Sequence, residues 1–183
     1  MGYVALIVVV SVIAWAILAR NRLVRLRVRS EEAWRDIDTQ LKRRWDLIPT
    51  LVEVVKGYAA HEAETFRRVT EARGLAVDAG SPREQAFAED RLKTSLRSVF
   101  LLVEEYPQLK ANENFLGLAG TLEEIEDAVQ RSRRYYNAVV RDLNTAIEIF
   151  PSRVIARLFR FVPREFYLLP GEEQRQAPKV SWT

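Results

Sequence analysis

The chain has 183 residues, and its 28 lysines and arginines against 25 aspartates and glutamates give a formal charge of +3. It contains no cysteine and one histidine, which excludes disulfides, thiol nucleophiles, iron–sulfur clusters and multi-histidine zinc sites. Five arginines between positions 20 and 29 account for the positive balance, so the rest of the chain lacks the basic surface that a nucleic-acid partner requires.

Residues 3–19 form an uncharged apolar run, YVALIVVVSVIAWAILA. At about 1.5 Å per helical residue this run would extend about 26 Å, close to the roughly 30 Å hydrocarbon core of a bilayer. A cleaved signal peptide carries its positive charge before the apolar run, whereas here the charge follows it. We therefore predict a transmembrane anchor over residues 1–19, with a cleaved signal or a buried core helix as the alternatives.

A basic juxtamembrane collar follows over residues 20–29, formed by Arg20, Arg22, Arg25, Arg27 and Arg29. Because basic residues beside a span remain on the cytoplasmic side, the collar predicts that the amino terminus lies outside and the remaining chain inside. Each arginine near an anionic leaflet contributes on the order of 1 kcal/mol of attraction, so anionic headgroups are expected partners.

Residues 30–170 are predicted to form an all-α domain, an antiparallel bundle of long helices with a short C-terminal helix, and residues 171–183 a polar tail. The spacing of apolar residues predicts a first helix from Ser30 to Ala76 that reaches toward the membrane as a stalk. Pro49 predicts a kink in it, with a true break as the alternative. Arg44 and Glu62 share its apolar face and are candidates for a buried polar cluster.

A polar turn over residues 77–82 predicts a second helix from Pro82 to Glu105, which Tyr106-Pro107 closes. Asn112 or Asn114 is placed to cap the third helix. That helix carries a heptad pattern, and its two glycines permit close helix approach or mark a frayed first turn. The heptad residues are Phe115, Leu122, Val129, Tyr136, Leu143 and Phe150, and the glycines are Gly117 and Gly120.

Pro151 ends the third helix, and Ser152 is expected to cap a short helix through Phe159. The apolar residues between Phe159 and Leu169 are expected to pack along the bundle. Asn137 and Asn144 lie beside the heptad stripe and are interpreted as polar contacts that set the helix register.

These motifs, taken in order, resemble the LemA family of bacterial membrane proteins over about residues 20–170. The resemblance implies an inner-membrane protein with an amino-terminal membrane helix, a helical bundle and no established enzymatic activity; some relatives are associated with the biogenesis of membrane organelles. The matching positions include Trp34, Arg44, Pro49, Tyr58, His61, Glu62, Tyr106, Pro107, Asn114, Tyr136, Asn137, Asn144 and Pro151.

No catalytic, cofactor-binding or metal-ligating residue is predicted, since His61, Glu62 and Glu64 point to different helix faces. We expect a non-enzymatic, membrane-anchored scaffold or adaptor that binds a membrane protein or further copies of itself. Trp45 and Phe66 are expected to be exposed contact residues. The alternative is a lipid-binding or membrane-shaping protein that acts through the collar.

Overall fold

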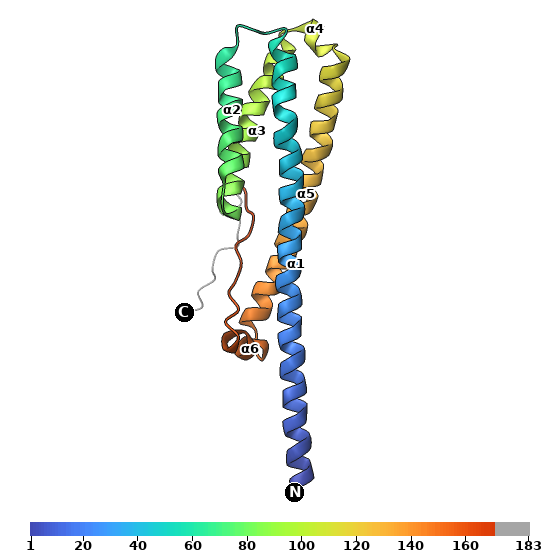
Figure 1. The fold of residues 1–183 in the computed structure, drawn as a ribbon, viewed down its shortest axis with the longest axis vertical. Coiled ribbons are helices and arrows are strands. Elements are labelled where there is room, and N and C mark those ends of the chain that lie inside the picture. Colours follow the sequence, from blue (N-terminus) through green and yellow to red (C-terminus); the bar gives the residue numbers. More distant parts are fainter. Residues whose placement is uncertain (171–183) are drawn as a thin grey trace, which may run out of the picture. The chain divides into compact units, whose positions relative to one another are not determined.

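The computed structural model describes residues 1–170, and every regular element within this range is a helix (Figure 1). The all-α prediction is confirmed, while the predicted tail over residues 171–183 lies outside the described part. The helices are α1 (Gly2–Lys56), α2 (Ala63–Asp78), α3 (Pro82–Glu104), α4 (Pro107–Lys110), α5 (Glu113–Glu148) and α6 (Ser152–Leu158).

The helix α1 contains the predicted anchor, the collar and the start of the bundle in 55 continuous residues. Within residues 1–170 it is the one helix long and apolar enough to cross a membrane, and none of its most apolar stretch is buried inside the protein. Apolar side chains that no protein atoms cover are suited to a lipid environment. This exposure agrees with the predicted transmembrane anchor.

The predicted single helix from Ser30 to Ala76 is wrong, because α1 ends at Lys56 and α2 begins at Ala63. The N–H groups of Tyr58 and Ala59 both donate to the carbonyl of Val55, at 3.1 and 3.0 Å, which closes the last turn. The next residue after the helix is Gly57, whose low helix propensity favours an end here. The apolar spacing happens to continue from Tyr58 to Val69, and this hid the interruption.

Pro49 does not break α1, which continues through it. A proline has no N–H to donate to the carbonyl four residues earlier, here that of Trp45. The side chain of Arg73 on α2 takes this role, because its Nε donates to the Trp45 carbonyl at 2.7 Å. A contact from a neighbouring helix thus replaces the missing backbone bond.

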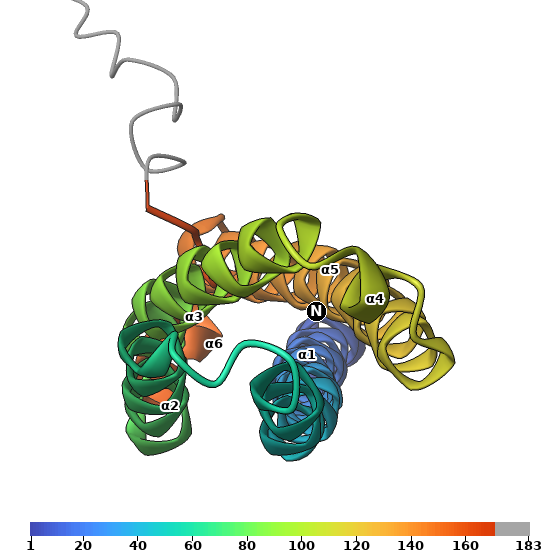
Figure 2. The ribbon, with the colours of Figure 1, turned by 90° about the horizontal axis from the view of Figure 1, so that it is seen from above.

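The chain divides into two compact units, and one of them contains residues 38–131 and 166–170 of the described range. In this unit the second part of α1 packs with α2, α3 and the first part of α5, so four helical segments replace the three that were predicted (Figures 1 and 2). Ser81 caps α3 at the predicted turn, with its Oγ accepting from the Glu84 N–H at 3.2 Å. The unit's largest fully buried side chains include Leu41, Ile48, Leu51, Val55, Val69, Leu92, Val99, Leu109 and Tyr167.

The other unit contains residues 1–37 and 132–165, in which α1 packs against the second part of α5 and against α6. Its core is a cluster of Leu23, Leu143, Ala146, Ile147, Ile155 and Ala156, with Ala16, Ala19, Leu26 and Phe161 against it. Two predictions fail here. Phe150 is exposed although it continues the heptad pattern, and the Ser152 hydroxyl donates to the Ala146 carbonyl at 2.7 Å instead of capping α6.

The start of α5 lies where the sequence predicts it. Asn112 is the capping residue, since its Oδ1 accepts from the Phe115 N–H at 3.0 Å, whereas Asn114 is exposed. Among residues 1–170, no helix approaches Gly117 or Gly120 closely, because a Cβ at either position would meet nothing within 4 Å.

Candidate functional site

A buried cluster of charged side chains lies among α1, α3 and α5. Arg44 is only 4% exposed, and its Nη1 lies 2.9 Å from Glu89 Oε2 and 3.2 Å from Glu126 Oε2. Trp45 Nε1 donates to the other oxygen of Glu89 at 2.7 Å, and Gln85 donates to the same oxygen at 3.3 Å. The prediction that Arg44 is part of a buried polar cluster is confirmed.

The pKa values of the two carboxyl groups in the cluster are shifted in opposite directions. Burial raises the pKa of Glu89, although the Arg44 charge and the Trp45 hydrogen bond oppose this. Burial also acts to raise the pKa of Glu126, but Arg44 and Lys93 outweigh it, so the pKa of Glu126 is lowered. Glu89 is therefore the group whose ionised form depends most on Arg44.

An apolar groove opens beside this cluster, between α3 and α5. Its volume is about 780 Å³, within the range typical of ligand-binding clefts. The α3 side contributes Lys93, Leu96, Arg97 and Phe100, and the α5 side contributes Leu116, Ala119, Gly120, Leu122, Glu123, Glu126 and Asp127, with Arg44 at one end. Apolar residues contribute most of this lining, which we call the floor, and the charged residues are basic on α3 and acidic on α5, which we call the two rims; Lys93 and Glu126 form an ion pair between them at 3.3 Å.

Two residues that carry the family resemblance, His61 and Glu62, lie in the loop between α1 and α2. His61 is exposed in the loop, and Glu62 is half-buried there and makes no part of the Arg44 cluster, contrary to its predicted place. Glu64 pairs with Arg67 and Arg68, whose hydrogen bonds lower its pKa to about 2. The described residues contain no group of three or more histidine, cysteine, aspartate or glutamate side chains that could hold a metal ion.

Other residues that carry the family resemblance lie in the turns between helices. The Tyr58 hydroxyl accepts from Asn112 Nδ2 at 3.1 Å, which connects the end of α1 to the cap of α5. Tyr106 immediately precedes α4, whose first residue is Pro107, and Pro151 immediately precedes α6. These residues shape the turns.

A second group of matched positions holds the segment after α6. The Tyr136 ring lies 5.4 Å from that of Trp34, and its hydroxyl donates to the Glu165 carbonyl at 2.8 Å. Asn144 donates to the Arg164 carbonyl and accepts from the Arg164 N–H, both at 2.9 Å. Asn144 therefore fixes the C-terminal segment, rather than the register between helices, and Asn137 stands one heptad before it on α5.

The five collar arginines divide into two groups according to the residues that surround them in the structure. The Arg20 guanidinium lies 5.0 Å from the centre of the Phe159 ring, and that of Arg27 lies 5.8 Å from the Phe161 ring. Such cation–π contacts tie the two side chains to the segment after α6.

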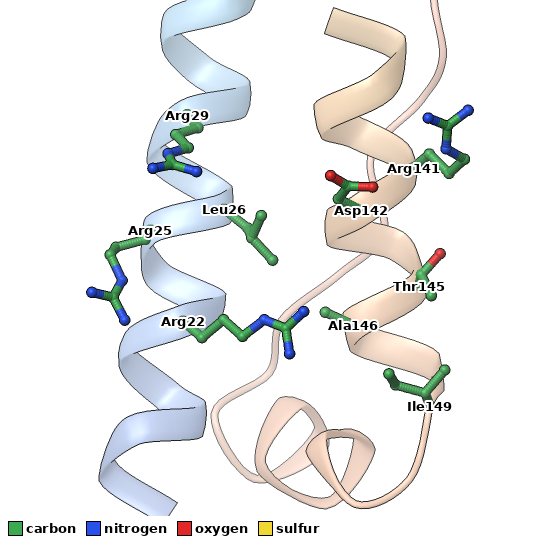
Figure 3. A pocket seen from close by; sticks show the side chains of 9 residues that line it. All are labelled: Arg22, Arg25, Leu26, Arg29, Arg141, Asp142, Thr145, Ala146 and Ile149. Atoms are coloured by element: carbon green, nitrogen blue, oxygen red, sulfur yellow. The ribbon is translucent and has the colours of Figure 1, made fainter.

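The remaining collar residues, Arg22, Arg25 and Arg29, line a cavity of about 520 Å³ between α1 and α5 (Figure 3). Arg22 extends toward α5, and Asp142 on α5 faces α1 (Figure 3). Arg141 also lines the cavity, but its side chain points away from α1, and the side chain of Arg25 points away from α5 (Figure 3). Arg22 is therefore the arginine whose guanidinium group extends between the two helices, where it favours an anionic ligand.

Sequence reasoning missed several of these features. Trp45 and Phe66 are buried, not exposed. Glu89 and Gln85 were not recognised, although they continue the spacing of Leu92 and Leu96 along the inner face of α3. Polar residues that extend an apolar stripe were the available signal.

Comparison with known proteins gives a consistent result. The LemA family profile matches residues 33–182. The protein named Protein LemA of Metamycoplasma hominis is 28% identical over 142 residues, which cover 75% of this chain and 64% of that protein. The chain therefore spans slightly less than two thirds of that relative.

Two relatives from Paramagnetospirillum magneticum, Magnetosome protein MamQ 2 and Magnetosome protein MamQ 1, are each 22% identical over 190 residues, covering 90% of this chain and 70% of the relative. The family match covers far more than half of the sequence. The chain belongs to the LemA family.

Proposed function

We propose that this protein is a non-enzymatic, membrane-anchored adaptor that binds an amphipathic helix of another membrane protein in the groove between α3 and α5. The observation that carries the proposal is the groove itself, which combines an apolar floor with rims of opposite charge. Amphipathic helices bind in such grooves through apolar residues spaced three and four apart.

The composition of the groove defines the partner. Gly120 leaves room along the floor, because nothing lies within 4 Å of the position a Cβ would take. Arg97 on one rim favours an acidic residue on one side of the bound helix, since Lys93 already pairs with Glu126 at 3.3 Å. Glu123 and Asp127 favour basic residues on the other side. The opposite charges would also set the direction in which the helix binds.

The membrane anchor contributes to this function by concentration. Two proteins held in one membrane meet at a higher effective concentration than in solution, so a groove with low binding affinity is sufficient. The arginines after the span support an orientation with the amino terminus outside and the groove in the cytoplasm, at the inner membrane of a bacterial cell.

Site-specific photocrosslinking in intact cells tests the adaptor proposal. A photoreactive residue at Ala119, in the groove, should crosslink a discrete membrane protein, whereas one at Arg68, exposed on α2, should not. Gly120→Leu would fill the floor and should abolish the product. Equal crosslinking from both positions, or a product that survives Gly120→Leu, would overturn the proposal, and a product of two copies of this chain would identify self-association instead.

The cavity lined by the collar favours a second candidate, the binding of anionic lipid headgroups in membrane or organelle biogenesis. The cavity begins at Arg22, about 4.5 Å along the helix beyond Ala19, and ends at Arg29, about 15 Å beyond it. Headgroups occupy about the first 5–8 Å next to the hydrocarbon core, so the end of the cavity at Arg22 lies at their depth. The relatives named magnetosome proteins support a role at a membrane organelle.

A charge-matched pair of variants separates a specific headgroup site from diffuse attraction. Arg22→Ser with Arg29→Ser removes two charges from the cavity, and Arg20→Ser with Arg27→Ser removes two at the same spacing but outside it. Native mass spectrometry of the full chain should show several-fold less retained phosphatidylglycerol for the first variant than for the second. Equal retention would mean that no specific site exists.

A further inference from the structure

We propose that α6 and the residues beside it form a second contact with the membrane, lying in the interfacial layer of the same bilayer that α1 crosses. The contact surface is the exposed apolar set Phe150, Val154, Leu158, Phe159 and Val162. This inference rests on the membrane attachment through α1, and it adds an element that does not span.

The depth of α6 follows from its packing on α1. Ile155 and Ala156, the buried side of α6, belong to the same cluster as Leu23, and Ala16 and Ala19 pack against that cluster. Ala19 is the last residue of the apolar run, so the level at which the run leaves the hydrocarbon core is also the level of α6. Figure 1 shows α6 beside α1 shortly after that run.

The outward side of this segment is unusually apolar. Phe150 is 83% exposed, Leu158 71% and Val162 73%, and no part of the described chain covers them. Contiguous exposed apolar side chains mark membrane or protein contacts. At the edge of the hydrocarbon core the bilayer itself can cover them.

The charges of the segment also fit an interface. Residues 149–164 contain four arginines and no acidic residue. Arg153 and Arg157 are exposed on α6, where their long stems can follow the apolar surface while the guanidinium groups reach phosphates. Arg20 over the Phe159 ring connects this segment to the collar at the same depth.

A soluble partner would have to enter the headgroup layer to cover this surface, because the cluster with Ala16 and Ala19 holds α6 there. The bilayer is already present at that depth. The membrane is therefore the occupant that the packing favours.

Accessibility measurements with a spin label test the inference on the full chain, which has no native cysteine to remove. The label would be placed singly through Leu158→Cys, Val9→Cys or Leu101→Cys and measured in nanodiscs of phosphatidylcholine and phosphatidylglycerol. Val9 lies within the apolar run, and Leu101 is a comparably exposed apolar residue on α3. We expect the ratio of oxygen to nickel-chelate accessibility at position 158 to exceed that at position 101 several-fold and to lie below that at position 9.

Three other outcomes are possible, and each contradicts either the inference about α6 or the membrane attachment of α1. If position 9 is lipid-exposed and position 158 is as water-accessible as position 101, the inference is wrong and the anchor stands. If position 158 is shielded from both reagents, protein covers α6, and the inference is again wrong. If position 9 is not lipid-exposed, the membrane attachment itself fails. The variant Arg91→Cys on α3, exposed and polar, supplies the fully aqueous reference.

Discussion

Replacing Arg73 by methionine should destabilise the protein because it leaves a carbonyl of α1 without a donor. Pro49 has no N–H, and Arg73 Nε donates to the Trp45 carbonyl at 2.7 Å in its place. Methionine keeps the apolar stem of the side chain and removes the donor. A hydrogen bond from a charged group contributes about 1.5–3 kcal/mol. Because Arg73 is half-buried, we expect a loss at the lower end of this range, about 1.5 kcal/mol.

This loss converts to a change in melting temperature. For a chain of this size each kcal/mol lowers the Tm by about 2–4 °C, so a decrease of roughly 3–6 °C is expected. Circular dichroism of the full chain in detergent micelles measures it.

The matched control is the same substitution in a Pro49→Ala background. An alanine at position 49 regains the N–H that donates to the Trp45 carbonyl, so the effect of Arg73→Met should fall to a few tenths of a kcal/mol. The difference between the two backgrounds is the coupling energy of Pro49 and Arg73. Equal losses in both backgrounds would show that Arg73 stabilises the helices by packing alone, which would refute the reasoning.

Three further outcomes are expected. Arg44→Met leaves Glu89 buried and uncompensated, at a cost of about 3–5 kcal/mol. The pKa of Glu89 is already raised in the folded protein, and it rises further without Arg44. The cost of Arg44→Met should therefore be smallest near the ordinary glutamate pKa of about 4.3 and should grow as the pH rises through the raised pKa. Adding Glu89→Gln should remove this pH dependence in urea titrations. Asn144→Ala removes both hydrogen bonds to the Arg164 backbone, so amide hydrogen exchange at residues 159–165 should accelerate about tenfold or more. The hydrogen bonds from Arg67 and Arg68 lower the pKa of Glu64, so carbon NMR should show this carboxylate titrating below the ordinary glutamate range, and because exposed ion pairs contribute little, Glu64→Gln should lower the Tm by less than Arg73→Met does.

The helices that begin with strong local signals could be predicted from the sequence. Ser81-Pro82 begins α3 and Asn112 caps α5, and in both cases the residue acts on its own neighbours. The end of α1 could not be found in this way, because the apolar spacing continued by coincidence from Tyr58 to Val69. Local chemistry determines where a helix begins more clearly than apolar spacing determines where it ends.

The candidate sites show a different limit. Arg44 was identified as a buried charge from its place on an apolar face, but Glu62 was named with it, and Glu89 of another helix is its partner, 45 residues later. Helical periodicity indicates which face a residue occupies and carries no information about which other helix will cover that face. The groove between α3 and α5 was beyond prediction for the same reason.

The collar illustrates how one sequence feature can serve two physical roles. All five arginines follow the apolar run and contribute equally to a charge bias across the membrane. Phenylalanines about 140 positions further along the chain engage Arg20 and Arg27, and this leaves Arg22, Arg25 and Arg29 to line the cavity. The two double variants that differ in lipid retention should therefore weaken membrane orientation to the same extent. Orientation depends on the number of charges, whereas headgroup binding depends on which of them the segment after α6 leaves unoccupied.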